Sequence, residues 1–336
     1  MQNENVENGL VKCEVCGKAF VDERALRIHV GMMHREKKRQ LLHNLDNGIS
    51  TIVAEIPKDV KYEDWSCAIE ILKKAYEAKL FVLIVGPKGT GKTTLVRKFA
   101  EIMNKPLYSI NFSLRTKESH LVGTTVLEGG CTKFVPGIIP KSMQEGAILY
   151  CDELNCAEPD VLVRLDEALD DRRELVLKEA GEVFRVKAHS DWFVIATINP
   201  LSHIGTKELP PQLLSRFPVR LYFDYPPIEI EKRIIRLHLG EDGINESDLD
   251  RAIKLANKLR DAAKVEDVYY APSIRETIAF AKLLKMGMKP REAAELVFAN
   301  VYYQWGELEV QKVKDLIGSL WGYPQFSLNP GGKNEG

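Results

Sequence analysis

The segment GPKGTGKTT (86–94) constrains the fold of this chain more than any other feature. It follows the apolar run FVLIV (81–85) and leads into TLVRKFAEIM, whose apolar residues recur at helical spacing. A G-x-x-x-x-G-K-[ST] pattern between a strand and a helix is typical of a phosphate-binding loop, because its backbone N–H groups point at phosphate oxygens. The sequence therefore predicts a nucleotide-binding α/β domain.

We expect the whole loop to take part in nucleotide binding. Lys92 is placed to reach the β and γ phosphates, and the Thr93 hydroxyl is placed to hold Mg2+. The glycines permit the tight loop. The other expected nucleotide-binding residues of this loop are Gly86, Pro87, Lys88, Gly89, Thr90, Gly91 and Thr94.

Apolar runs predict the rest of the domain. Their continuous apolarity indicates strands buried on both faces, and their alternation with helical stretches predicts a doubly wound, parallel five-stranded sheet. From Ile228 to about Trp321 the pattern is almost wholly helical, with candidate caps at Asn245, Ser247 and Ser273, so an all-helical lid should follow. The runs are FVLIV (81–85), LYSIN (107–111), AILYC (147–151), WFVIAT (192–197) and VRLYF (219–223).

Length and composition place the chain among ordinary globular proteins. With 336 residues, 28% charged residues and a formal net charge of -1, two or three compact units are expected, and bulk charge gives no sign of a nucleic-acid partner. The run 80–85 is too short to span a membrane, and the polar opening MQNENVENG does not fit a signal peptide. Four cysteines lack a disulfide pattern, which favours the cytosol: Cys67, Cys131, Cys151 and Cys156.

The expected organisation has five parts. An amphipathic helix is expected from Tyr62 to Lys79, where the main domain should begin. The predicted boundaries are a Cys/His module over 1–36, a linker over 37–61, the nucleotide-binding core over 62–225, the helical lid over 226–323 and a disordered tail over 324–336.

The segment AILYCDE places two acids at the end of a strand. Asp152 is a candidate Mg2+ ligand beside Thr93, and Glu153 is a candidate to orient an attacking water. An acidic pair in this position is also typical of a plain helix N-terminus. The functional interpretation therefore depends on the phosphate-binding loop upstream.

In this order the motifs resemble those of the AAA+ ATPases, and within their dynein-related branch the MoxR group that includes NirQ, CbbQ and GvpN proteins. The resemblance covers about residues 62–323 and implies hydrolysis of ATP to ADP and phosphate, with Mg2+. In WFVIATINP, Asn199 matches the sensor-1 residue that helps position water. In ELPPQLLSRF, Arg216 matches the arginine finger that reaches a neighbouring subunit's nucleotide, and in APSIRETI, Arg275 matches the sensor-2 arginine of the lid.

The resemblance also implies an assembly and two tools for acting on a partner. An arginine supplied by a neighbour implies a ring, which in this family is a hexamer. ATP is favoured over GTP because the chain has no N/T-K-x-D motif for reading guanine. Segments 122–137 and 174–186 each alternate around a glycine-containing turn and predict β-hairpins, which resemble the helix-2 insert and the pre-sensor-1 hairpin.

The N-terminal segment CEVCGKAFVDERALRIHVGMMH carries metal-ligand spacing. Two thiolates and two imidazoles in a C-x2-C-x12-H-x4-H pattern predict a structural, tetrahedral Zn2+ site in a ββα zinc finger. The base-reading positions of such a finger would hold Asp22, Ala25 and Ile28, which do not match the side chains that read bases. The expected zinc ligands are Cys13, Cys16, His29 and His34.

These observations favour a hexameric, cytoplasmic MoxR-like ATPase that remodels or matures a protein client recruited by the zinc finger. The resemblance suggests a von Willebrand A domain protein as a partner. An alternative is a nucleic-acid-associated motor in which the finger and the basic run REKKRQ (35–40) hold DNA or RNA. A third reading, a nucleotide-gated scaffold with little hydrolysis, is disfavoured by the intact pair of Asp152 and Glu153.

Overall fold

The computed structural model describes residues 54–322, with gaps at 129–130, 179–183, 202–204 and 241–242, and three short strands nearer the N-terminus. The chain divides into two compact units, Met1–Val53 and Ala54–Gly336. Among the described residues, every helix is too short or too polar to cross a membrane.

In the first unit the described residues form a small antiparallel sheet. Its strands are β1 (Val6–Glu7), β2 (Leu10–Lys12) and β3 (Ala19–Phe20), in the order β1-β2-β3. The zinc ligands expected from the sequence, Cys13, Cys16, His29 and His34, lie outside the described residues. The zinc finger therefore stays a prediction, although Cys13 and Cys16 fall in the connection between two strands that pair with each other.

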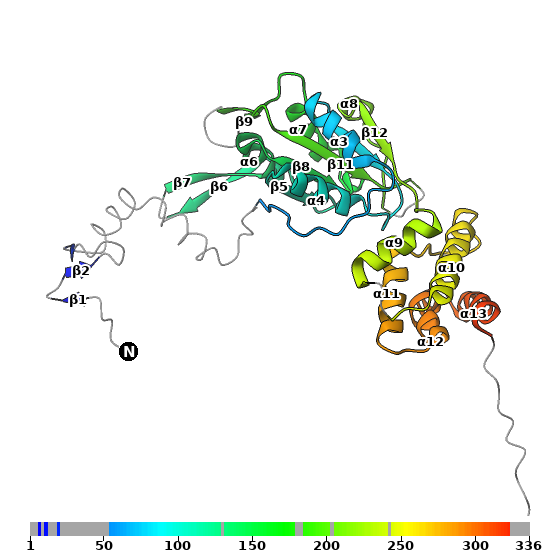
Figure 1. Ribbon diagram of the computed structural model, residues 1–336. Helices are drawn as coiled ribbons and strands as arrows, with labels where there is room; N and C mark the ends of the chain where they lie inside the picture. The colour runs from blue at the N-terminus through cyan, green and yellow to red at the C-terminus, as the bar shows by residue number, and fades with distance from the viewer. Residues whose placement is uncertain are drawn as a thin grey trace, which may run out of the picture. The chain divides into compact units, whose positions relative to one another are not determined.

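The larger unit is built on a five-stranded parallel sheet in the order β12-β4-β11-β8-β5, which confirms the predicted fold class (Figure 1). Because β4, β11 and β8 are neighbours, the loops that follow them meet at one edge of the sheet. The strands are β4 (Val82–Val85), β5 (Leu107–Asn111), β8 (Ile148–Asp152), β11 (Phe193–Ile198) and β12 (Val219–Tyr222).

Burial differs between central and edge strands. Residues 148–151 of β8 and 193–197 of β11 are fully buried. In contrast, β12 alternates between half-buried and exposed side chains, and Tyr222 is 70% exposed. The prediction of strands buried on both faces is therefore wrong for the two edge strands, for all of β12 and for the second half of β5, where side chains remain open to solvent.

Helices surround this sheet (Figure 1). The predicted helix over 62–79 is too long, because α3 begins only at Ala68. The carboxylate of Asp64 accepts the backbone N–H groups of Ala68 (2.9 Å) and Ile69 (3.2 Å) and so fixes the helix start. The helices of the core are α3 (Ala68–Glu77), α4 (Lys92–Met103), α5 (Glu118–Val122), α6 (Ile138–Glu145), α7 (Pro159–Ala168) and α8 (Pro211–Ser215).

Both predicted hairpins are present. Strand β6 (Gly123–Glu128) pairs antiparallel with β7 (Cys131–Pro136), and β9 (Glu174–Leu177) pairs with β10 (Phe184–Lys187). Gly123 has a φ of +120°, and a Cβ there would lie 2.4 Å from the carbonyl oxygen of Val135. Only glycine fits at the base of the first hairpin.

The lid is wholly helical, as predicted. Its core contains buried aromatic residues such as Phe280, Phe298 and Tyr302. Asn245 and Ser273 cap their helices with their side chains, whereas Ser247 lies inside α10. The lid helices are α9 (Ile228–Leu239), α10 (Glu246–Lys264), α11 (Ile274–Lys285), α12 (Pro290–Ala294) and α13 (Glu307–Trp321), with short π and 3-10 segments over 295–304.

The segment 54–65, which we call the strap, belongs to the larger unit. Glu55 forms an antiparallel bridge with Leu107 at the edge of the sheet, with N···O distances of 3.0 and 2.7 Å. The carboxylate of Glu55 pairs with the guanidinium of Arg97 in α4 at 2.7 Å. The last part of the predicted linker, residues 54–61, therefore belongs to the larger unit, where Glu55 is held on the sheet edge and on α4.

Candidate nucleotide-binding site

A cavity of about 320 Å3 lies where the loop after β4 meets the lid. The glycines of this loop are required by geometry, since Gly89 and Gly91 have φ values of +74° and +92°. A Cβ on Gly89 would also lie 2.2 Å from the Cβ of Ser273 in the lid. The loop and the lid therefore approach each other as closely as glycine allows.

The structure brings most of the predicted site residues to this cavity. Gly86 and Pro87 lie just behind it, where their carbonyl oxygens contact Lys92. The predicted residues that line the cavity are Lys88, Gly89, Thr90, Gly91, Lys92, Thr93, Thr94, Asp152, Glu153, Asn199 and Arg275.

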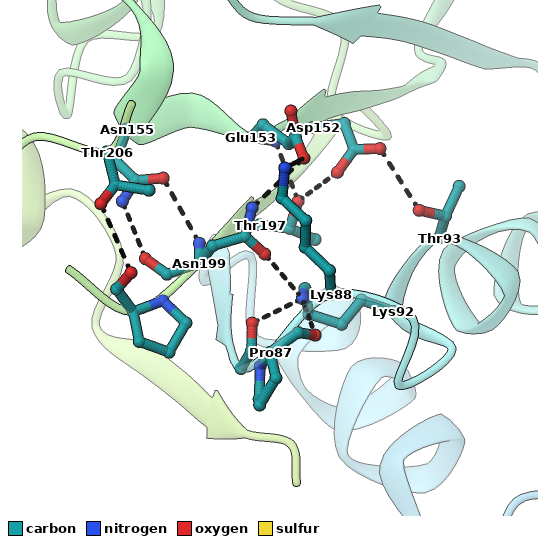
Figure 2. Close-up of polar contacts among 12 residues, drawn as sticks. Pro87, Lys88, Lys92, Thr93, Asp152, Glu153, Asn155, Thr197, Asn199 and Thr206 are labelled. Atoms are coloured by element: carbon teal, nitrogen blue, oxygen red, sulfur yellow. Dashed lines mark hydrogen bonds and ion pairs between the residues drawn. The ribbon is translucent and has the colours of Figure 1, made fainter. Parts of the chain in front are cut away.

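Lys92 lies at the centre of the site, as Figure 2 shows. Its Nζ donates to the carbonyl oxygens of Gly86 (2.6 Å) and Pro87 (2.7 Å) and to Oδ1 of Asn199 (3.2 Å). Burial lowers the pKa of Lys92 to about 8. An anionic ligand at this point would raise the pKa of Lys92 again, because it favours the charged ammonium group.

The residues predicted to hold Mg2+ fit that ion. The Thr93 hydroxyl donates to Oδ2 of Asp152 at 3.3 Å and lies 3.0 Å from the hydroxyl of Tyr150. Oδ1 of Asp152 accepts a hydrogen bond of 2.6 Å from the buried hydroxyl of Thr197. A hydroxyl beside a carboxylate is the kind of oxygen donor set that Mg2+ takes when substrate phosphates supply further ligands.

Glu153 is held at the same end of the cavity. Its Oε1 accepts from Nδ2 of Asn199 at 3.2 Å and pairs with Nζ of Lys88 at 3.3 Å (Figure 2). Its backbone is in the left-handed region, with a φ of +53°, which is unfavourable for a residue with a side chain. Strain of this kind is common at functional sites, where the surrounding structure holds it in place.

Asn199 is itself fixed in position. The side chain of Asn155 donates to the Asn199 carbonyl at 2.8 Å and accepts from its backbone N–H at 3.3 Å. Both residues are buried. The Asn199 side chain is therefore free to bridge Lys92 and Glu153, which come from different loops.

The two predicted arginines lie in different places. Arg275, in the first turn of α11, lines the cavity from the lid side. Arg216 is not among the described residues that line the cavity, and its guanidinium instead pairs with Asp166 (3.0 Å) and Asp170 (3.2 Å).

Sequence reasoning missed several contributors. Thr197 and Tyr150 are polar residues inside apolar strand runs, a signal that was available in the sequence. The strap was missed because its lining residues follow no motif. The further lining residues are Lys61, Tyr62, Glu63 and Trp65 from the strap and Ile234, His238, Ile274 and Ile278 from the lid.

Comparison with known proteins supports the same division of the chain. Residues 81–217 match the model of the AAA domain (dynein-related subfamily), and residues 231–302 match the model of the CbbQ/NirQ/NorQ C-terminal domain. The first match lies within the core and the second lies within the lid.

Curated relatives span most of this chain. It is 34% identical over 239 residues to the denitrification regulatory protein NirQ of Pseudomonas aeruginosa, and the aligned region covers 71% of this chain and 89% of that protein. It is 32% identical to the NirQ protein of Stutzerimonas stutzeri, and that alignment covers 67% of this chain and 79% of the relative. It is 30% identical to the protein NorQ of Paracoccus denitrificans, and that alignment covers 76% of this chain and 91% of the relative. The chain therefore belongs to the CbbQ/NirQ/NorQ family of AAA+ ATPases.

Proposed function

We propose that this chain hydrolyses ATP to ADP and phosphate and couples that reaction to the remodelling or maturation of a protein client. The observation that carries the proposal is the arrangement of Glu153, Asn199 and Lys92 around one cavity closed by a lid arginine. Phosphoryl transfer needs positioning and nearby cations more than covalent chemistry. This site supplies both.

Each residue has a role in the proposed reaction. The loop amides and Lys92 bind the phosphates, and Thr93 and Asp152 hold Mg2+, which neutralises phosphate charge when bound. Glu153 orients a water and accepts its proton, while Asn199 holds the Glu153 carboxylate. The water oxygen forms a bond to the γ-phosphorus as the bond to the bridging oxygen breaks, and ADP and phosphate leave.

Arg216 supports a ring. Its guanidinium lies outside the cavity of its own chain, yet the family motif gives that arginine a place at a nucleotide. We propose that it serves the next subunit of a hexamer. The two ion pairs that hold it are about a quarter exposed, and such pairs are weak enough to exchange for a phosphate.

The client role draws on relatives. Two of them carry the name denitrification regulatory protein. We propose that the two hairpins, β6–β7 and β9–β10, act on the client, with a von Willebrand A domain protein as a candidate partner. A cytoplasmic location stays a prediction.

For the N-terminal unit we propose that Cys13, Cys16, His29 and His34 hold one Zn2+ and that the resulting finger recruits the client. The antiparallel pairing of β2 and β3 on either side of the two cysteines supports a finger hairpin. Zinc measured by atomic emission in the purified full chain should be equimolar. The Cys13→Ser protein should lose it, and the Cys67→Ser control, which changes an exposed thiol of the larger unit, should keep it.

The test of the ATPase function is Glu153→Gln. Turnover should fall by about 100-fold or more, while ATP still binds. The control is Glu158→Gln, which changes a nearby half-exposed carboxylate whose ion-pair partner among the described residues is Lys207. If Glu153→Gln hydrolyses ATP as fast as the unchanged protein, the assignment of Glu153 fails.

The same variant tests the client. Glu153→Gln loaded with ATP should co-purify with a discrete protein from native extract, with or without nuclease, and removal of residues 1–36 should abolish capture. If the captured material is nucleic acid, or vanishes with nuclease, the client role is wrong. The chain would then be a nucleic-acid-associated motor.

A further inference from the structure

One tyrosine contacts both the phosphate-binding loop and the lid. Tyr225 lies in the short connection between β12 and α9. Its hydroxyl donates to the backbone carbonyl of Lys88 at 3.1 Å, and the centroid of its ring lies 4.1 Å from Cζ of Arg260 in α10. The connection between the two subdomains is thus attached to both of them by a single side chain.

Arg260 is a fixed platform for that ring. It is 3% exposed, and its two terminal nitrogens donate to the carboxylate of Glu231 at 2.8 and 3.0 Å. Its Nε donates to the carbonyl of Pro272 at 2.8 Å. A guanidinium whose edge is held in this way can still offer its flat face to an aromatic ring.

From Arg260 the contacts lead to the nucleotide cavity. Pro272 precedes Ser273, which caps α11 by accepting from the Arg275 N–H at 3.2 Å. Ser273 also lies against Gly89 of the loop. The orientation of the first turn of α11, and with it the position of Arg275 at the cavity, depends on how Arg260 and Ser273 are seated.

Side-chain packing alone does not hold Tyr225. A second cavity of about 430 Å3 adjoins it and Arg260, and it is bounded by Trp65 and Lys264. The ring therefore has open space beside it, and its polar contact with Lys88 and its contact with Arg260 determine where it sits. Burial raises the pKa of the Tyr225 hydroxyl to about 12, so the group remains a donor at neutral pH.

We propose that Tyr225 is a positioning residue that sets the seating of the lid against the phosphate-binding loop and thereby places Arg275 at the γ-phosphate. The inference rests on the proposed ATPase function. The Tyr225 hydroxyl binds the backbone carbonyl of Lys88, and the side chain of Lys88 pairs with Glu153. Tyr225 therefore also connects the lid to the proposed water-orienting residue.

The test is Tyr225→Phe, which keeps the ring on Arg260 and removes only the hydroxyl bond to Lys88. We expect kcat to fall about three- to tenfold, the range for loss of one hydrogen bond, with a smaller change in KM. Tyr222→Phe is the matched control, because Tyr222 lies three positions earlier and is 70% exposed. It should behave like the unchanged protein.

A double-mutant cycle separates positioning from a merely structural role. If Tyr225 acts through Arg275, Tyr225→Phe should change kcat little once Arg275→Ala is present, so that the two effects are not additive. Additive effects, or a Tyr225→Phe protein with unchanged kcat, would overturn the inference.

Nucleotide affinity gives a readout that does not depend on turnover. Fluorescent ADP and a fluorescent non-hydrolysable ATP analogue should bind the unchanged protein with a preference for the ATP analogue, and both Tyr225→Phe and Arg275→Ala should reduce that preference. If the unchanged protein shows no hydrolysis, the proposed function fails. The inference about Tyr225 is then decided by the ratio of the affinities for the ATP analogue and for ADP. Tyr225→Phe should lower this ratio, and an unchanged ratio would reject the inference.

Discussion

Thr197 donates a hydrogen bond of 2.6 Å to Asp152 from the neighbouring strand of the sheet. The same hydroxyl oxygen accepts the backbone N–H of Glu153 at 3.2 Å. One buried side chain on β11 therefore fixes both acids at the end of β8. The carboxylate of the proposed Mg2+ ligand and the backbone of the proposed water-orienting residue are therefore held by the same hydroxyl group.

Replacing Thr197 by valine should keep the shape of the side chain and remove both contacts. We expect kcat to fall about tenfold or more and the Mg2+ concentration for half-maximal activity to rise, because Asp152 loses its fixed orientation. A Mg2+ titration at saturating ATP measures both. Thr197→Ser keeps the hydroxyl and should restore most of the activity, whereas an unchanged Mg2+ requirement in Thr197→Val would contradict the role.

The pKa of Lys92 predicts a pH dependence. Burial lowers it to about 8 from 10.5, so the free protein loses this positive charge as pH rises through 8. ATP affinity should therefore fall by about fivefold between pH 8 and pH 9. Between pH 8 and 10.5 the unfolded chain binds the extra proton, so this group makes the ligand-free protein more stable as pH rises.

Fluorescent-ATP titrations from pH 7 to 9.5 measure the predicted loss of affinity. Lys92→Arg is the informative control, because a guanidinium stays charged over this range. Its affinity should be nearly independent of pH even if it is weaker throughout. An equal fall in both proteins would assign the pH effect to another group.

The place of Arg216 predicts complementation between inactive proteins. Arg216→Ala lacks the finger but keeps Glu153, and Glu153→Gln keeps the finger. Mixed in equal amounts, they should form rings in which a Glu153→Gln subunit completes the site of an Arg216→Ala neighbour, so that activity rises well above the sum of the two.

A matched mixture controls for this experiment. Lys92→Ala with Glu153→Gln should stay inactive, because no subunit of that mixture has both a complete phosphate-binding loop and a water-orienting acid. If the Arg216→Ala and Glu153→Gln mixture is equally inactive under conditions in which rings form, Arg216 does not act across the subunit boundary.

The buried ion pair of the lid predicts a large stability effect. Glu231 is 0% exposed and binds Arg260 through both of its oxygens. Glu231→Gln leaves a buried guanidinium without its counter-charge and should cost about 3 kcal/mol or more of unfolding free energy. Urea denaturation followed by circular dichroism measures it.

Glu229→Gln is the control for this change. Glu229 is on the same helix, its side chain is 79% exposed, and it is one of three carboxylates that pair with Lys232, beside Glu246 and Asp250. An exposed carboxylate contributes little to stability, and Lys232 keeps its other two partners, so the denaturation midpoint should barely move. Similar losses of unfolding free energy from both substitutions would mean that the buried ion pair contributes no more to stability than the exposed carboxylate does.

The fold could be predicted from local pattern, but the pairing within the site could not. Central strands are apolar throughout, so the sequence predicted strands at FVLIV, AILYC and WFVIAT. Alternation of side-chain type around a glycine-containing turn predicted the hairpins. The start of α3 was missed because Asp64 caps from four residues before Ala68. The pattern of apolar residues continues through the cap and gives no sign of it.

Contacts that depend on sheet order were beyond sequence reasoning. Tyr150 and Thr197 come together only because β8 and β11 are neighbours in space, and nothing local states which strands are adjacent. The same holds for Tyr225 and Lys88, which are 137 positions apart. The motifs named the residues of the site, while their supports depend on the assembled sheet and lid.

The bridge between Glu55 and Leu107 adds the strap to the outer edge of β5, the last strand of the sheet. The edge of a sheet presents unpaired backbone N–H and C=O groups that can pair with a second chain. The strap occupies the N–H and the carbonyl oxygen of Leu107, so this part of the edge is closed to pairing with another molecule.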